Sequence, residues 1–149
     1  MSGLRLVNDS SGGNTRSRIM VNSGSFDFQD PVYIDSNGFL APATAGGKII
    51  GVFADADITA TSDNQTVLQA KGRYWPINDD MEFEITADQA CTNTDCGAYA
   101  DLAVAAGAYT LNLAAGTSGQ FLVLDFDATT TTLVRVTCAE RQQDAFTQD

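Results

Sequence analysis

Histidine is absent from this chain of 149 residues, and basic side chains are few. Without histidine there is no Ser-His-Asp or Cys-His nucleophile and no histidine-ligated metal site. Eight lysine and arginine residues stand against 19 aspartate and glutamate residues, which gives a net charge of −11. Because phosphate contacts require a concentrated positive surface, this charge argues against a nucleic-acid partner.

Long apolar segments are also missing. The longest charge-free segment, residues 102–124, is interrupted by glycine, threonine, asparagine, serine and glutamine. It therefore lacks the run of about 20 apolar residues that spans a bilayer. The start of the chain is polar and rich in glycine and serine, without the apolar stretch of a signal peptide. These absences predict a protein with no membrane partner and no export signal.

Cysteine is scarce, and its three occurrences are Cys91, Cys96 and Cys138. An odd number argues against a closed disulfide framework, and no fourth ligand at a suitable spacing completes a zinc site. Cys91 and Cys96 are close enough in sequence to form a small loop. We expect reduced thiols that behave as small apolar residues.

The charges that are present are unevenly distributed. Arg5, Arg16 and Arg18 lie near the N-terminus, whereas residues 74–134 contain no lysine or arginine. The polar N-terminal segment cannot bury much surface by itself, so it is either a frayed end or a segment that orders on a neighbouring subunit. We expect three parts: a flexible N-terminal arm (1–24), a β-domain (25–140) and a C-terminal tail (141–149).

The sequence pattern is that of strands. Residues 82–86 and 109–113 alternate polar and apolar with a period of two, and Asn37-Gly38 is a strong hairpin turn. Helical periodicity is plausible only in residues 95–104. Further strands are expected at residues 31–34, 39–41, 48–54, 66–77, 120–126 and 132–137. Regular spacing of strands and turns predicts a single all-β antiparallel sandwich or barrel with at most one short helix.

Carboxylates two residues apart are the obvious candidates for chemistry, because such pairs share one face of a strand. The pairs are Asp55/Asp57, Glu82/Glu84 and Asp125/Asp127. Glycosidase chemistry requires two carboxylates across a cleft, and calcium requires several oxygen ligands. We favour solvated strand faces, since no EF-hand spacing follows Asp55. The aromatic pair Tyr74-Trp75 is either a recognition platform or, as we favour, part of the core. We expect no catalytic residue, cofactor or metal.

Two parts of the chain resemble a known family. Residues 30–43 read DPVYIDSNGFLAPA and are followed by IGVF at 50–53, and further blocks are DDMEFEI at 79–85, DCGAYADL at 95–102 and LVRV at 133–136. These blocks resemble the small β-domains of tailed-bacteriophage capsid decoration (cement) proteins. One departure is that Gln29 stands where the family has glycine before Asp-Pro.

The resemblance implies a non-enzymatic protein on the outside of a virion, made in the host cytoplasm, whose partners are the major capsid protein and further copies of itself, often as a trimer. The N-terminal arm would grip the shell. Its candidate contacts are Leu4, Arg5, Leu6, Val7, Arg16, Arg18 and Ile19. The charge-free region would form the oligomer interface. Its candidates are Leu102, Val104, Tyr109, Leu111 and Leu113.

Two other functions remain open from the sequence. One is a head-fibre or tail-associated virion protein that contacts the host surface. The other, from a different class, is a carbohydrate-binding or carboxylate-using β-enzyme, against which the missing signal peptide counts.

Overall fold

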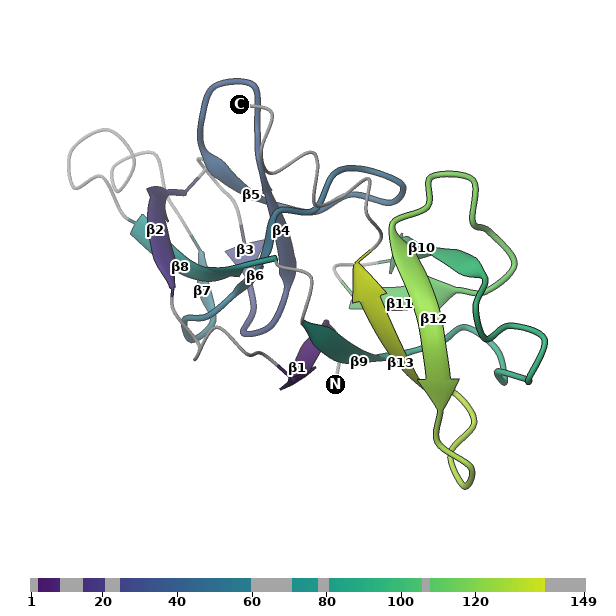
Figure 1. Ribbon diagram of the computed structural model, residues 1–149. Helices are drawn as coiled ribbons and strands as arrows, with labels where there is room; N and C mark the ends of the chain where they lie inside the picture. The colour runs from purple at the N-terminus through teal and green to yellow at the C-terminus, as the bar shows by residue number, and fades with distance from the viewer. Residues whose placement is uncertain are drawn as a thin grey trace.

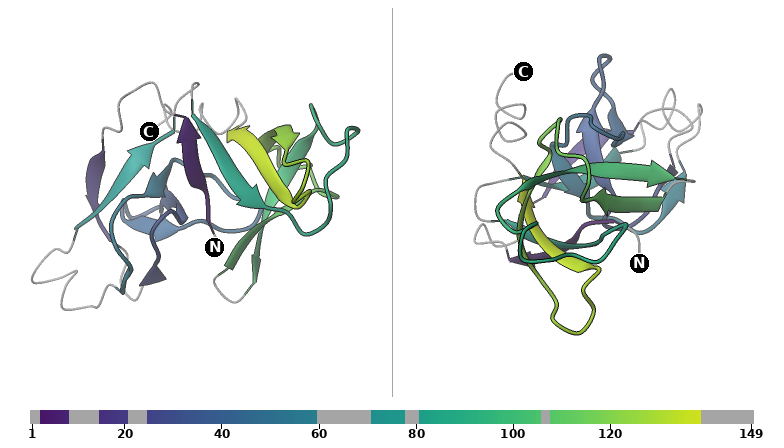
Figure 2. Two further views of the ribbon diagram at one scale, coloured as in Figure 1. Left: turned by 90° about the horizontal axis from the view of Figure 1, so that it is seen from below. Right: turned by 90° about the vertical axis from the view of Figure 1, so that its right-hand side faces the viewer.

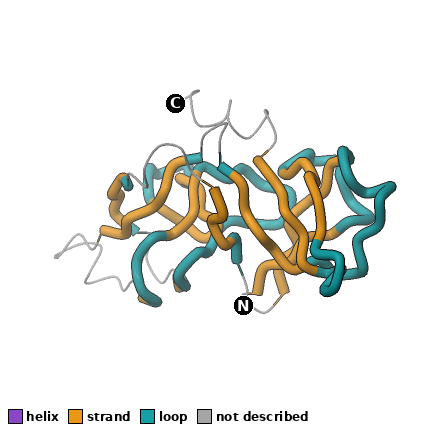
Figure 3. Tube along the Cα trace, turned by 60° about the horizontal axis from the view of Figure 1, so that its bottom comes forward, coloured by secondary structure: helices purple, strands orange, loops and turns teal. Residues whose placement is uncertain are grey.

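The structure is a computed structural model that describes residues 3–8, 15–20, 25–59, 71–77, 81–105 and 108–138. Within these residues there are thirteen strands and no helix (Figure 1). The strands form two main sheets that lie side by side and a small two-stranded ribbon (Figure 3). The predicted all-β antiparallel class is therefore confirmed.

The larger sheet has six strands, and every ladder pairing in it is antiparallel. In spatial order they are β1 (Arg5–Asn8), β9 (Glu82–Thr86), β13 (Leu133–Cys138), β12 (Phe121–Phe126), β10 (Tyr99–Ala105) and β11 (Ala108–Asn112). A bridge between Ala87 and Leu111 brings the β11 edge back towards the end of β9. The sheet consequently curls into a half-barrel (Figure 2).

The smaller main sheet has five strands. In spatial order they are β2 (Arg16–Ile19), β8 (Lys71–Pro76), β6 (Gly51–Phe53), β4 (Pro31–Ile34) and β5 (Leu40–Pro42). The ribbon consists of β3 (Ser25–Phe26) and β7 (Ile58–Thr59). A bridge between Met20 and Leu40 connects the two edges of the five-stranded sheet, so this sheet also curves around its apolar side chains.

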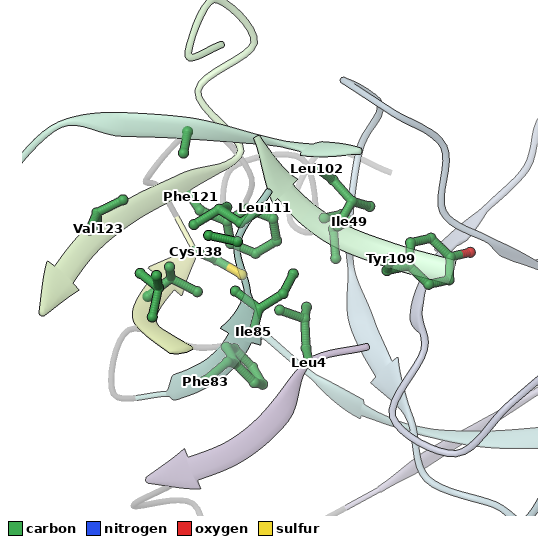
Figure 4. Close-up of a cluster of buried hydrophobic side chains, with 14 of the residues drawn as sticks. Leu4, Ile49, Phe83, Ile85, Leu102, Tyr109, Leu111, Phe121, Val123 and Cys138 are labelled. Carbon is green, nitrogen blue, oxygen red and sulfur yellow. The ribbon is translucent and has the colours of Figure 1, made fainter. Parts of the chain in front are cut away.

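The alternation in the strands supplies two apolar cores. Phe83 and Ile85 of β9 point into a large cluster (Figure 4). Val134 and Val136 of β13 belong to the same cluster. Val52 of the five-stranded sheet belongs to the same cluster, so the core continues across the junction of the sheets. The smaller cluster lies between the five-stranded sheet and the ribbon, which contributes Phe26. Its members are Met20, Phe26, Val32, Leu40, Ile50, Phe53 and Tyr74.

The N-terminal segment is not a separate arm where the structure describes it, so that prediction is wrong for residues 3–8 and 15–20. β1 pairs with β9 in one sheet and β2 pairs with β8 in the other. Leu4 is fully buried and Met20 almost so. Backbone pairing together with these two apolar side chains outweighs the polar composition of the segment. Residues 9–14, 21–24 and the predicted C-terminal tail lie outside the described residues.

Residues 95–104, where a short helix was plausible, form a turn and a strand instead. A turn is closed by the Asp95 backbone N–H, which donates to the Thr92 carbonyl at 3.0 Å, and β10 follows. Ala100 and Leu102 of this strand point into the core. The ladder to β11 and burial on one side override the weak helical spacing.

Candidate binding cavity at the junction of the sheets

The predicted shell-contact residues in and just before β1 divide between the core and the surface. Leu4 lies in the core and Leu6 packs against it half-buried, so neither side chain is a free contact point. Arg5 is exposed and forms an ion pair with Glu84. Val7 is 37% exposed. The expected contact through Leu4 is therefore wrong, because the leucine anchors β1.

The remaining candidates lie on β2, at the edge of the five-stranded sheet. Arg16 and Arg18 are exposed, and Arg18 Nη1 donates a hydrogen bond to the Gly38 carbonyl at 3.2 Å. Ile19 pairs with Lys71 through the ladder, and its side chain lies outside the described part. This edge keeps two exposed arginines of the predicted contact set.

The predicted oligomer face is largely internal. Leu102 and Leu111 face each other across the β10–β11 ladder and are buried in the large cluster together with Tyr109. Leu113 is partly buried against it, and Val104 is 38% exposed. The interface prediction is wrong for the three buried residues, because the charge-free composition of this region serves the interior of the half-barrel.

A tight turn at residues 27–30 precedes β4 and holds a buried acid. The Asp30 N–H donates to the Asp27 carbonyl at 3.0 Å, and the Asp27 N–H donates to Asp30 Oδ2 at 2.9 Å. Gln29 has a φ of 74°, the positive value that the third residue of a type II turn requires. This turn fixes the Asp30 side chain.

The turn is tied to both neighbouring segments by its backbone. The Gln29 carbonyl accepts from the Leu4 N–H at 2.9 Å, and the Gln29 N–H donates to the Phe53 carbonyl at 2.9 Å. The Asp30 carbonyl accepts from the Phe53 N–H at 2.7 Å. The backbone around Asp30 is thus held by the N-terminal segment and by β6.

Asp30 is a buried carboxylate with one oxygen unused. The residue is 3% exposed, and Oδ1 accepts no hydrogen bond from any residue that the structure describes. Burial raises the pKa of Asp30 to about 6, and the nearby carboxylates of Asp27 and Asp57 act in the same direction. A buried acceptor without a donor is costly, so this oxygen is a feature to be explained by function.

Asp30 lines a cavity of about 640 Å³ where β4 and β5 meet the β10–β11 hairpin. Asp27, Asp35, Tyr33 and Tyr109 also line it. The Tyr109 hydroxyl points away from the large cluster (Figure 4) and donates to the Ala43 carbonyl at 3.1 Å. Burial raises the pKa of Tyr109, and the carboxylates of Asp30 and Asp27 raise it further. We call this space the Asp30 cavity.

A second, smaller cavity of about 270 Å³ contains some of the predicted paired carboxylates. Glu84, Asp125 and Asp127 line it together with Arg135. Glu84 is ion-paired with Arg5. Hydrogen bonds from the backbone N–H groups of Thr130 and Thr129 lower the pKa of Asp127, which fixes the β12–β13 turn. Glu84 and Asp127 are thus engaged in structural contacts.

The other predicted pair is engaged in the same way. Asp55 forms an ion pair with Arg73, and Asp57 Oδ1 accepts from the Phe28 N–H at 3.0 Å. Tyr74 is buried, as preferred from the sequence, while Trp75 is half-buried and meets Phe28 edge-on with ring centroids 6.0 Å apart.

Hydrogen bonds of one buried glutamine side chain also connect the two sheets. The side chain of Gln120 is fully buried, and its Oε1 accepts from the Leu102 N–H at 2.6 Å and the Gly46 N–H at 3.1 Å. Its Nε2 donates to the Gly47 carbonyl at 2.6 Å. We call these contacts the Gln120 junction. They tie β10 to the loop between β5 and β6.

Neither Gln120 nor Asp30 was a candidate from the sequence. Nothing in the sequence distinguishes Gln120 from a surface glutamine before a strand. Asp30 appeared only within the DPVYI block of the resemblance, and its neighbours in the cavity come from turns and strands far apart in the chain. A Gln-Asp-Pro turn with glutamine at a glycine-like position is the signal that could have found it.

Comparison with known proteins gives no matching family model and no matching curated protein. Within the described segments, nothing helical is long and apolar enough to cross a membrane. In the same segments, no three histidine, cysteine, aspartate or glutamate side chains are grouped so that they could hold a metal ion.

Proposed function

We propose that this chain is a structural protein of a tailed-bacteriophage virion that binds the outside of the assembled capsid and stabilises the shell. Its partners are the major capsid protein and further copies of itself. It acts without catalysis and without a cofactor. The proposal rests on the resemblance of residues 30–53 and of the blocks between 79 and 136 to capsid decoration proteins.

One observation carries the proposal. The family pattern has glycine before Asp-Pro, and the chain has Gln29 there, with a φ of 74°. A positive φ is a conformation that glycine adopts readily and other residues adopt at a cost. At this departure from the pattern, Gln29 therefore has a backbone conformation that glycine adopts readily. This match of geometry supports the resemblance at the point where the sequence weakens it.

The paired N-terminal segment changes how attachment is expected to work. Because β1 and β2 lie in the sheets, the grip would come from an exposed surface of the folded body. Arg16, Arg18 and Val7 are exposed and remain candidates. Many copies around a symmetric shell multiply weak contacts, so each copy can bind modestly and stay attached.

Self-association is part of the proposal, with a trimer as the expected state because closed cyclic symmetry suits a position on a capsid axis. Light scattering at micromolar concentration, and again on isolated particles, tests it. A 15.8 kDa monomer in both settings would contradict it.

Particles of the phage that encodes this chain provide the main test. Quantitative mass spectrometry of gradient-purified particles is expected to find the chain in tens to hundreds of copies, and particles that lack it should release DNA at a lower temperature. Absence from purified particles would refute the proposal. A few copies that remain with isolated tails would assign it instead to the tail or to a head fibre.

A further inference from the structure

The Asp30 cavity holds a negative charge that the described part of the chain does not neutralise. Oδ2 of Asp30 is engaged by the Asp27 N–H, while Oδ1 is buried and accepts no hydrogen bond from a described residue. Asp27 and Asp35 add two carboxylates to the lining, in which no described residue is a lysine or arginine. A buried carboxylate is normally paired with a donor or a cation, and Asp30 is one of the residues that line the cavity.

The chemistry of the lining favours an organic cation over a metal ion. The described residues offer no group of three metal-ligating side chains, and calcium requires six or more oxygen ligands. Tyr33 and Tyr109 add aromatic side chains beside the carboxylates. A guanidinium group suits this combination, because its planar fork donates to carboxylates and stacks on aromatic rings.

The chain's own described arginines do not fill the cavity. None of them lines it, and Arg5 and Arg73 form ion pairs with Glu84 and Asp55. Exposed Asp27 and Val104 lie among the lining residues, so the cavity is accessible from the surface. An arginine from outside this part of the chain can therefore enter the cavity.

We infer that the Asp30 cavity is a binding site for an arginine side chain presented by the partner to which this protein attaches. The identity of that partner as the capsid shell rests on the proposed function. The Asp30 carboxylate would accept a guanidinium N–H, and Asp27 or Asp35 would supply further negative charge. Repeated at every copy, this one contact would add specificity for a basic loop of the shell.

NMR titration with N-acetyl-arginine methylamide tests the site, with the neutral N-acetyl-citrulline methylamide as the matched ligand. We expect the arginine compound to shift the amide signals of Asp30, Val104 and Tyr109, with a dissociation constant on the order of 1 mM. The citrulline compound should bind much more weakly. Equal shifts with both compounds, or no shifts, would overturn the inference.

Substitutions locate the charge that is responsible. Asp30→Asn, which keeps the shape of the side chain, should weaken arginine binding about tenfold or more. Asp125→Asn removes the same charge in the smaller cavity and should leave binding unchanged. If Asp30→Asn does not fold, Asp27→Asn is the substitute and should weaken binding about threefold. Equal affinities of the wild type and the Asp30 or Asp27 variant would overturn the inference.

Further arms identify the occupant. Arg141 lies outside the described residues, so the variant Arg141→Gln is also tested. A large increase in its affinity for the arginine compound would mean that the chain's own Arg141 occupies the cavity. Calcium that shifts the same signals at micromolar concentration would assign it to a metal. Either result overturns the inference.

The particle assay separates this inference from the proposed function. Asp30→Asn is expected to attach to stripped particles about tenfold more weakly than Asp125→Asn. If Asp30→Asn attaches as well as the wild type, the inference of a shell arginine in the cavity is overturned and the proposed function stays intact. No attachment by the wild type, combined with Asp30-dependent arginine binding, would refute the proposed function and leave the site with another partner.

Discussion

Two polar side chains are buried where the sheets meet, and they differ in how completely they are satisfied. Gln120 is fully buried, with both ends of its amide bonded to backbone groups of the two sides. Asp30 is almost as deeply buried, yet one of its oxygens has no donor among the described residues. The satisfied side chain of Gln120 connects the two sheets, whereas the unsatisfied oxygen of Asp30 belongs to the group for which we infer a ligand.

The largest effect is expected at the Gln120 junction. Gln120→Leu leaves the Leu102 and Gly46 N–H groups and the Gly47 carbonyl without partners, and should lower the free energy of unfolding by about 4 kcal/mol. Chemical denaturation measures the loss. The control is Asn112→Ala at a half-buried amide that accepts one local hydrogen bond, from Ala114, with an expected loss of about 1 kcal/mol or less. Similar losses would remove the distinction claimed for Gln120.

A somewhat smaller loss of stability is expected from substitution of Leu4, which contacts the turn that carries Asp30. Leu4 is fully buried, and its backbone N–H donates a hydrogen bond to the Gln29 carbonyl. Leu4→Ala should cost about 3 kcal/mol, while Val7→Ala in the adjoining strand β1, at a residue 37% exposed, should cost under about 1 kcal/mol. Thermal unfolding of both variants checks the expectation. A silent Leu4→Ala would restore the view of residues 1–24 as a flexible arm.

The strained position next to Asp30 offers a gain. Gln29→Gly should raise the free energy of unfolding by about 1 kcal/mol, because glycine adopts the positive φ without strain. Gln29→Ala is the matched control and should bring no gain, since alanine keeps the strained Cβ. A glycine variant no more stable than the alanine variant would show that the turn is not strained there.

The smallest effect concerns the reactivity of the cysteine thiols, which depends on burial alone. Burial raises the pKa of Cys91 to about 11 and that of Cys138 to about 12, so both are scarcely ionised at about pH 8. Cys96 is partly exposed. Iodoacetamide treatment of the native protein should give one adduct at Cys96 by mass spectrometry, and unfolded protein should give three. Rapid native labelling of Cys138 would contradict the buried placement.

The local pattern was enough to predict much of the fold. The alternation at residues 82–86 coincides with β9, and the strand expected at 109–113 is shifted by one residue from β11 (Ala108–Asn112). The Asn37-Gly38 hairpin forms as expected, with Gly38 at a φ of 86°. These features depend on neighbours in sequence, which a local pattern records.

The features that failed depend on contacts between distant residues. Leu4 and Met20 order a polar segment because the two sheets provide places for them. Leu102, Tyr109 and Leu111 looked like an interface because composition does not tell the inside of a half-barrel from an exposed face. Asp30 and Tyr109 are 79 positions apart in sequence and line one cavity only after folding. The candidate site was therefore outside the reach of spacing rules.

NMR titration of the Asp30 side-chain carboxyl carbon tests most directly the claim that this acid is buried and unpaired in the free protein and binds an arginine. We predict a pKa of about 6 in the free protein, against about 3.9 for an unfolded chain, and a fall when N-acetyl-arginine methylamide binds. Between these two pKa values the folded protein keeps the Asp30 proton while the unfolded chain loses it. The wild type should therefore lose stability relative to Asp30→Asn as the pH rises from about 4 to about 6. A pKa near 4 that the arginine compound does not change would contradict both the buried, unpaired acid and its ligand.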